Sequence, residues 1–372
     1  DDLFIRYFTV RYQLYKLTNY MEHTPELEET DSYLHATDFA RAWMLGIIPT
    51  EEVYREMMGR ISSPAQIKAI TTVLNDNVRF NKEKERYADI KNVDFSLFRS
   101  LAQKIVDRIL EIELKRGDSE TQVTSLAEEL SYIYGANTFI HILQAFGKDT
   151  FIRDSYNWGS TKRGVLSSLL HACHPLPTDT SENLKKLAKQ AEISDERLVE
   201  AAMFAPQWIE LTEKAIGWKG LTSAAYYFHA HTNETCDDKK KAIIARYTPI
   251  DVEDLREGAF DIDWFRDAFK TIGKRRFEVV YNAAKYISCS NSHTRARKFA
   301  DATNGAVKAA DIKKEIVAKR NKDLLMSYGL IPLGRKPDKE LLDRYQYLQK
   351  FLKESKEFGA QRQESEKKAV AI

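Results

Sequence analysis

Apolar residues recur at intervals of three and four positions along most of the chain. In one clear stretch, closed by Gly117, the apolar positions are Leu97, Leu101, Ile105, Ile109 and Ile112. This spacing places apolar side chains on one face of an α-helix. Continuous alternation of apolar and polar residues, which indicates strands, is scarce. The pattern therefore predicts an all-α fold with little or no sheet.

Capping residues and glycines divide this pattern into short helices. Ser119 and Gln122 fit a capping box that opens a helix ending at Gly135. Pro206 ends one helix and can open the next, because proline suits the first helical turn. The further helices we expect are 136–146, 195–205, 207–216, 263–272, 275–287, 292–303, 308–327 and 339–372. The last is expected to be unbroken, with a buried stripe at Tyr345, Leu348, Leu352, Ser355 and Phe358.

Helices of this length joined by short capped turns are typical of HEAT-like stacked helical pairs, and we predict an irregular helical solenoid. No fixed-period sequence repeat is found, and an irregular helical domain fits nearly as well. Polar segments suggest boundaries near residues 157 and 235. The expected parts are an N-terminal region 1–157, a central region 158–235 and a basic C-terminal region 236–372, together forming one superhelical unit.

Cysteine content and hydropathy indicate a protein of the cytoplasm. Cys173, Cys236 and Cys289 are odd in number and far apart, so no disulfide framework is expected. No run of about 18 apolar residues is found, so no membrane span is expected. The chain begins at Asp1 without an initiator Met, and its last helical pattern reaches Ile372 without a stop signal. We therefore expect it to be cut from a longer protein.

Charge changes this picture in the C-terminal third. The net charge is only +2, but residues 237–372 hold 30 Lys and Arg against 21 Asp and Glu, and residues 274–322 hold 13 against 4. Clustered cations on a nearly neutral chain favour nucleic acid or another polyanion as a partner. The alternative is a solvated outer face. The candidate binding residues are Lys274, Arg275, Arg276, Arg295, Arg297, Lys298, Lys313 and Lys314.

Two groups of possible metal ligands deserve comparison with known spacings. They are His171, Cys173 and His174, followed by His229, His231 and Cys236. Zinc takes four such ligands in a tetrahedron, but neither group has a C-x-x-C or H-E-x-x-H spacing. The competing interpretation is a buried cysteine and hydrogen-bonded histidines. Gly-x-Ser-x-Gly is absent as well. We expect no cofactor, and a metal-dependent enzyme remains an alternative only.

Several segments resemble a family of large bacterial proteins known only as a domain of unknown function. The segments are Leu198–Trp208, Phe260–Ala268, Ala283–Ser288, Lys319–Asp323 and Phe351–Arg362. Some members carry a Trp-Gly-Arg domain and the label "molybdate metabolism regulator-like". The resemblance runs from about Trp158 to the end and implies that the chain is the middle of a longer protein. It implies no catalytic residue.

The function that the sequence favours is a helical scaffold or interaction module within a larger bacterial multidomain protein. We expect this part of the protein not to be an enzyme, because no catalytic motif is found. The expected partners are another protein or the flanking domains of the same chain, with nucleic acid as a further possibility and no membrane.

Overall fold

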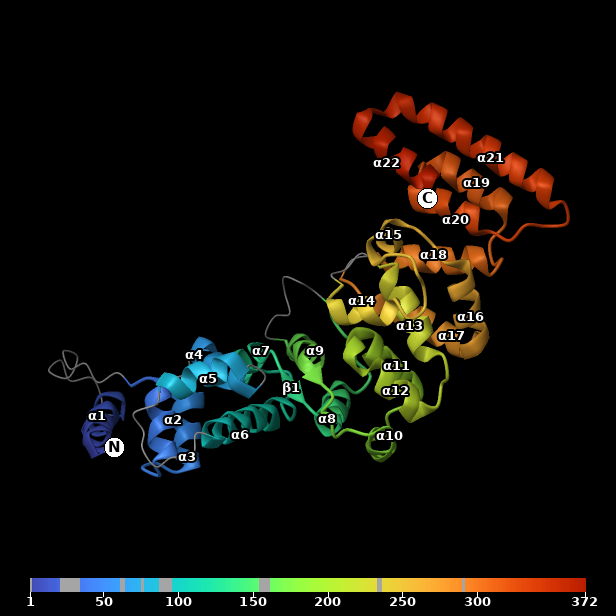
Figure 1. Cartoon of the computed structure of the whole chain (residues 1–372). Helices are drawn as coiled ribbons and strands as arrows, with labels where there is room; N and C mark the ends of the chain where they lie inside the picture. The colour runs from blue at the N-terminus through green and yellow to red at the C-terminus, as the bar shows by residue number, and fades with distance from the viewer. Residues whose placement is uncertain are drawn as a thin grey trace. The chain divides into compact units, whose positions relative to one another are not determined.

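The computed structural model describes residues 2–20, 34–60, 64–74, 77–86, 96–153, 161–232, 236–289 and 292–372 (Figure 1). Over these residues the fold is all-α, which confirms the predicted class. The one sheet in these ranges is a parallel pair, β1 (Ile133–Tyr134) and β2 (Cys173–His174). The chain forms two compact units, Asp1–Asp179 with Gln190–Ile193, and Thr180–Lys189 with Ser194–Ile372.

Within the described residues, the first unit is built from nine α-helices, and α6 (Ser96–Glu113) has a buried apolar face along most of its length. Its helices are α1 (Asp2–Tyr20), α2 (Ala36–Met44), α3 (Thr50–Arg55), α4 (Pro64–Thr71), α5 (Asn77–Arg86), α6 (Ser96–Glu113), α7 (Thr124–Glu128), α8 (Ala136–Phe146) and α9 (Lys162–Ala172), with a π turn at Glu56–Arg60 and a 3₁₀ turn at Thr72–Leu74. The stripe predicted on α6 is buried at Leu101, Ile105 and Ile109. This face packs against α2, α4 and α7.

The helix predicted from Ser119 to Gly135 is wrong, and a buried polar cluster explains why. Arg116 donates to Glu113 at 2.5 Å and to Thr124 at 3.2 Å, and the Thr121 hydroxyl donates to Glu113 at 2.8 Å. The Thr121 amide also donates to the Thr124 hydroxyl at 2.9 Å. These side chains satisfy the backbone of the connection locally, and so they compete with helix formation. Only the five-residue α7 and the strand β1 form there.

The second unit surrounds a helix that is buried on all sides. Its helices are α10 (Ser181–Gln190), α11 (Asp195–Phe204), α12 (Ile209–Ile216), α13 (Leu221–Ala230), α14 (Asp238–Ile244), α15 (Val252–Glu257), α16 (Ile262–Ile272), α17 (Lys274–Ala283), α18 (His293–Thr303), α19 (Ala309–Lys319), α20 (Lys322–Leu330), α21 (Pro337–Glu354) and α22 (Ala360–Ala371), with 3₁₀ turns at Pro206–Trp208, Ala284–Tyr286 and Ser355–Phe358. Every residue of α13 is buried. Its Tyr227 hydroxyl donates to the carbonyl oxygen of Ala296 on α18 at 2.9 Å.

Two long helices predicted near the C-terminus are each broken in the structure. Residues 308–327 form α19 and α20, separated by Arg320 at φ +42° and by Asn321, which caps α20. Residues 339–372 form the hairpin of α21 and α22, which turns at Gly359 with φ +84°. The predicted buried stripe is wrong at Tyr345 and Phe358, which are exposed. The hairpin instead buries Phe351 and Arg344 from α21.

Packing in the second unit joins helices that are distant in sequence. α11 packs against α17, and α13 packs against α16, α17 and α18, in addition to chain neighbours. In a regular solenoid each repeat packs only against its neighbours along the chain, and the contacts of α11 and α13 also reach further. HEAT-like stacking therefore stays a prediction. Both predicted boundaries, near 157 and 235, fall outside the described residues. Among the helices that the structure describes, none combines the length and apolar character that a membrane span needs.

Candidate functional site

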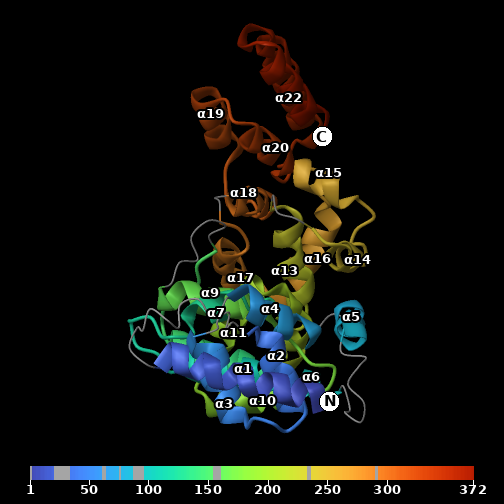
Figure 2. The same cartoon turned by 90° about the vertical axis from the view of Figure 1, so that its left-hand side faces the viewer.

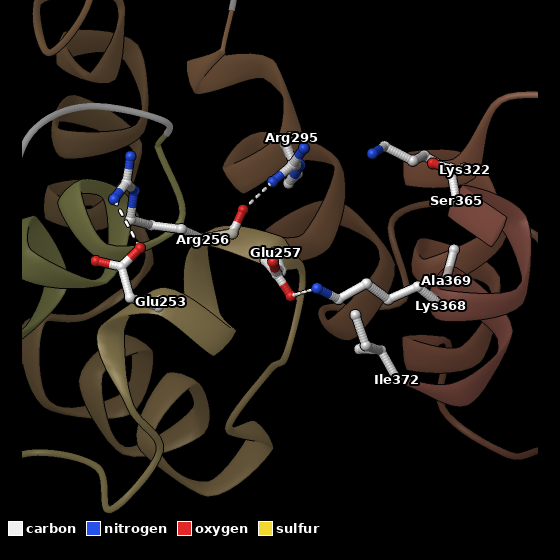
Figure 3. Close-up of a pocket in the computed structure, with 9 residues that line it drawn as sticks. All are labelled: Glu253, Arg256, Glu257, Arg295, Lys322, Ser365, Lys368, Ala369 and Ile372. Carbon is white, nitrogen blue, oxygen red and sulfur yellow. Dashed lines mark hydrogen bonds and ion pairs between the residues drawn. The ribbon is translucent and has the colours of Figure 1, made fainter. Parts of the chain in front are cut away.

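A charged pocket of about 360 Å³ lies among four helices of the second unit (Figure 3). α15 and α18 form one side, and α20 and α22 form the other. Its nine lining residues are Glu253, Arg256, Glu257, Arg295, Lys322, Ser365, Lys368, Ala369 and Ile372.

The α15 side of the pocket is fixed by local capping. The Asp251 carboxylate accepts from the Glu253 amide at 2.8 Å and opens the helix. Gly258 closes it at φ +128°, where a Cβ would collide with the Met326 side chain of α20. Within the helix, Arg256 donates to Glu253 at 2.8 Å. The end of α15 is therefore held against α20, with its charged side chains on the pocket.

Arg295 of α18 joins three elements at the pocket. Its Nε donates to Asp323 of α20 at 2.9 Å, and its Nη1 donates to the backbone carbonyl oxygen of Arg256 on α15. Asn321 caps α20 by accepting from the Asp323 amide at 2.8 Å, so the carboxylate that meets Arg295 is positioned by a local signal. The same cap makes Lys322 the first residue of α20.

Lys322 differs from the other cations of the pocket. Lys368 forms an ion pair with Glu257, Arg256 pairs with Glu253, and Arg295 pairs with Asp323. Lys322 is exposed, and no ion-pair partner for it is found among the described residues. Figure 3 shows its ammonium group extending toward the guanidinium of Arg295. One positive charge therefore remains without a counter-charge at the pocket.

The chemistry that this arrangement allows is anion binding. Two cationic groups that approach the same open space attract an anion between them, and charge-assisted hydrogen bonds to guanidinium and ammonium are the strong ones. Nucleophilic catalysis needs a nucleophile beside a base. Among the nine lining residues, Ser365 carries the hydroxyl group, and no histidine or cysteine is present.

The eight predicted polyanion-binding residues are distributed over three helices. Lys274, Arg275 and Arg276 begin α17, Arg295, Arg297 and Lys298 lie on α18, and Lys313 and Lys314 lie on α19. α17 and α19 lie apart in both views of the chain (Figures 1 and 2). Of the eight, Arg295 is the one that lines the charged pocket. The other seven residues do not line this pocket.

Three of these cations make contacts that stabilise the fold. Arg297 donates to the carbonyl oxygens of Tyr281 and Asn282 at 2.9 and 3.0 Å, where α17 ends with unsatisfied acceptors. Lys313 lies over the Tyr347 ring at 4.7 Å. Arg276 lies over the Trp218 ring at 5.3 Å. Among the described residues, no ion pair or ring contact is found for Lys274, Arg275, Lys298 and Lys314.

The first histidine and cysteine group lies at the end of α9 and in β2. His171 is exposed, while Cys173 is buried, with its Sγ 3.9 Å from the carbonyl oxygen of Gly135. Burial raises the pKa of the Cys173 thiol. The His174 ring lies 5.4 Å from the ring of Tyr132. Cys173 is thus a buried cysteine, whereas His171 is exposed and His174 is partly buried.

The second group surrounds the end of α13. His231 is buried, with Nδ1 2.8 Å from the carbonyl oxygen of Tyr227 and Nε2 3.2 Å from that of Ala259. Burial lowers its pKa to about 4, although the two backbone contacts act in the opposite direction. His229 is buried beside Tyr226, and Cys236 is partly buried. Among the described residues, no three or more His, Cys, Asp or Glu side chains converge as metal ligands.

Sequence reasoning missed most of the residues that line the charged pocket. Glu257 and Lys368 were not singled out, although they form an ion pair between α15 and α22. No local motif relates them, because they lie far apart along the chain. Lys322 lies at the end of the basic stretch, and its helix-opening position after Asn321 was a usable signal.

The first unit has a groove of its own, of about 660 Å³, between α6 and α8. Its lining mixes apolar and polar side chains: Asp107, Leu110, Glu111, Leu114, Lys115, Asn137, Thr138, His141, Gln144 and Ala145. Glu111 is already paired with Arg108 and Lys115 at 2.7 and 3.2 Å. No concentration of one charge marks this groove.

The fold is all-α, with two helical units and a charged pocket in the second. The model of a family of unknown function, DUF5724, matches residues 1–372, and the chain belongs to this family. The resemblance to a domain of unknown function is thereby confirmed. No curated protein and no solved structure matches the chain.

Proposed function

We propose that the chain is a helical binding module within a larger bacterial protein and that it holds a phosphate-bearing polyanion through the charged pocket. The observation that carries the proposal is Lys322, which has no ion-pair partner among the described residues and extends toward Arg295 (Figure 3). A phosphate group between them would accept from both side chains. The backbone and carboxylate contacts of Arg295 hold its guanidinium in place before the ligand arrives.

The cations outside the pocket have a supporting role in this proposal. Lys274, Arg275, Lys298 and Lys314 have no ion-pair partner among the described residues. Such charges increase the long-range attraction of a polyanion and the salt dependence of its binding. Nucleic acid is one source of the phosphate groups, and inorganic polyphosphate is another.

A protein partner or flanking domain is a second candidate, favoured by apolar residues at the start of α21. Leu341, Leu342 and Tyr345 are exposed there. Neighbouring exposed apolar side chains on one helix are a feature of protein-interaction surfaces. In this second candidate function, the flanking domains would include a Trp-Gly-Arg domain, and the larger protein would be a regulator. Free thiols at Cys173, Cys236 and Cys289 support a cytoplasmic location.

The proposal is tested by fluorescence anisotropy with two probes, a labelled single-stranded 20-mer oligonucleotide and labelled inorganic polyphosphate. Lys322→Glu is expected to weaken binding of whichever probe is the ligand by about tenfold at low salt, because one phosphate contact becomes a repulsion. Lys185→Glu is the matched control, since Lys185 of α10 is exposed and the net charge changes equally. Equal weakening by both variants, or no binding of either probe, would contradict a pocket site.

A further inference from the structure

The charged pocket contains a second lysine, and the ion pair of this lysine crosses the pocket. Lys368 of α22 pairs with Glu257 of α15, so the pair joins the two sides of the pocket (Figure 3). The two side chains are 57% and 46% exposed. Exposed ion pairs are weak, because water screens the charges and two long side chains must be held in one geometry. Lys368 can therefore exchange Glu257 for a more highly charged anion at little cost.

Three cationic groups from three helices are then available at one pocket. Lys322 has no ion-pair partner among the described residues. The Nη2 atom of Arg295 is not used in either of the hydrogen bonds that this side chain makes to the described residues. Figure 3 shows the ammonium groups of Lys322 and Lys368 both extending toward the α15 and α18 side. An anion in this space can accept from Lys322, from Arg295 and, once it is released, from Lys368.

The charge and the number of oxygens decide which anion can displace Glu257. A carboxylate, or a phosphodiester within a nucleic-acid chain, has a single negative charge shared by two free oxygens. Either group would replace Glu257 at Lys368 by a group of equal charge, with no gain. A terminal phosphate carries about −1.5 to −2 charges at neutral pH and has three acceptor oxygens. It gains charge at Lys368 and has one oxygen for each of the three cationic groups.

The size and the acidic lining of the pocket also favour the end of a chain. The volume of about 360 Å³ is near the lower limit of the ~300 to 1,000 Å³ that is usual for small-ligand sites. Glu253 and Glu257 line the same space. A continuous run of phosphates laid across the pocket would pass both carboxylates and be repelled. A single terminal group has to meet only the cations.

We propose that the charged pocket binds the terminal phosphate of a polyanion, with Lys368 leaving Glu257 to hold this phosphate together with Lys322 and Arg295. The inference rests on the proposed function and narrows it from a phosphate polymer to the end of one. Glu257 is the specificity-determining residue, because it occupies Lys368 until an anion of higher charge arrives. The 5′-phosphate of a nucleic acid and the ends of inorganic polyphosphate share this chemistry.

The first test uses the whole chain and two single-stranded 20-mer oligonucleotides of one sequence, labelled at the 3′ end. One has a 5′-phosphate and the other a 5′-hydroxyl. Fluorescence anisotropy at low salt is expected to show about tenfold tighter binding of the 5′-phosphate probe. Lys368→Gln is expected to reduce this preference to about twofold and to leave the affinity of the 5′-hydroxyl probe unchanged. Lys367→Gln is the matched control, since Lys367 is exposed on the same helix and lies outside the pocket lining.

A second variant tests the role of Glu257. Glu257→Gln releases Lys368 for any anion, so it is expected to tighten binding of the 5′-hydroxyl probe about threefold and to reduce the preference for the 5′-phosphate. Glu210→Gln is its control, because Glu210 of α12 forms an exposed ion pair with Arg246 away from the pocket. Circular dichroism checks that each variant remains folded.

A third measurement separates the two sources of terminal phosphate. Unlabelled polyphosphate of short or long chain length competes with labelled polyphosphate, at equal total phosphate. Short chains have more ends per phosphate, so they are expected to compete better if the pocket binds ends. Long chains are expected to compete better if the pocket binds the interior of the polymer, because binding to a continuous polyanion increases with the number of phosphates contacted.

The terminal-phosphate inference is overturned by equal binding of the two oligonucleotides together with better competition by long polyphosphate. It is also overturned if Lys368→Gln and Lys367→Gln change the 5′-phosphate preference equally, or if that preference persists in Lys322→Glu. Failure of the proposed function gives a different result. Lys322→Glu would then leave the affinity of every probe unchanged, whereas a failure of this inference alone leaves its effect on all probes intact.

Discussion

Arg320 joins the end of α19 to the hairpin of α21 and α22, and its removal has a calculable cost. Its guanidinium lies between two rings, 4.2 Å from the centroid of Phe351 and 4.2 Å from that of Phe358. Its Nε and Nη2 donate to both carboxylate oxygens of Glu366 at 3.1 and 2.9 Å. Nη2 also donates to the carbonyl oxygen of Phe351 at 3.0 Å. The Arg320 side chain therefore donates to acceptors in both α21 and α22.

The perturbation we choose is Arg320→Met, which keeps the length and apolar stem but removes the charge. The Glu366 side chain is 5% exposed, and among the described residues it would keep Arg362, at 3.0 Å, as its cationic partner. Removing one member of a buried ion pair costs about 3 to 5 kcal/mol, because the other charge stays buried. Since Arg362 remains, we expect the lower end, about 3 kcal/mol.

The assay is hydrogen exchange of the α21 and α22 amides, which reports local opening without assuming that two units unfold together. Arg320→Met is expected to speed exchange there by about a hundredfold, the factor that corresponds to 3 kcal/mol. Lys319→Met is the control, because it removes the exposed pair with Glu315 at 3.0 Å. Exposed pairs contribute about 0 to 1 kcal/mol. Unchanged protection in Arg320→Met would show that Arg320 does not stabilise the hairpin.

Two further predictions concern buried titratable groups. The folded pKa of His231, about 4, lies below the unfolded value, so the ring is neutral when folded and stability is lost as the pH falls from about 6.5 toward 4. We expect a loss of about 2 kcal/mol between about pH 8 and pH 5 in urea titrations, and a flatter profile in His231→Gln; parallel profiles would contradict this. Burial and a raised thiol pKa should make Cys173 at least about a hundredfold slower than exposed Cys289 toward iodoacetamide in the folded protein. Peptide mass spectrometry measures both rates, and equal rates would show that Cys173 is accessible.

Helices with local start and stop signals could be predicted closely. The helix expected at 263–272 is α16, Ile262–Ile272, because the Asp261 carboxylate caps two of its first amides and Gly273 ends it. The break at Arg320 could not be predicted in this way, since a left-handed arginine is stabilised by Glu354 and Glu366 from later helices. Asn321, a good N-cap, was the signal available there.

Of the charged pocket, the sequence could indicate only the part that lies within one basic stretch of the chain. The excess of cations between residues 274 and 322 led to Arg295, but not to its partners on other helices. The histidine and cysteine groups show a second limit of closeness in sequence. His231 lies close to His229 in sequence, yet both of its ring nitrogens face backbone carbonyl oxygens in the core. Closeness along a helix does not make two side chains converge, because adjacent positions point in different directions.

The measurement that tests the central proposal most directly is the salt dependence of polyanion binding in the unmodified chain and in Lys322→Gln. A cation that contacts a phosphate releases counterions, so the slope of log K against log salt counts such contacts. Lys322→Gln is expected to make that slope shallower by about one unit, while Lys185→Gln leaves it unchanged. An identical slope in the unmodified chain and Lys322→Gln would contradict a phosphate site at the pocket.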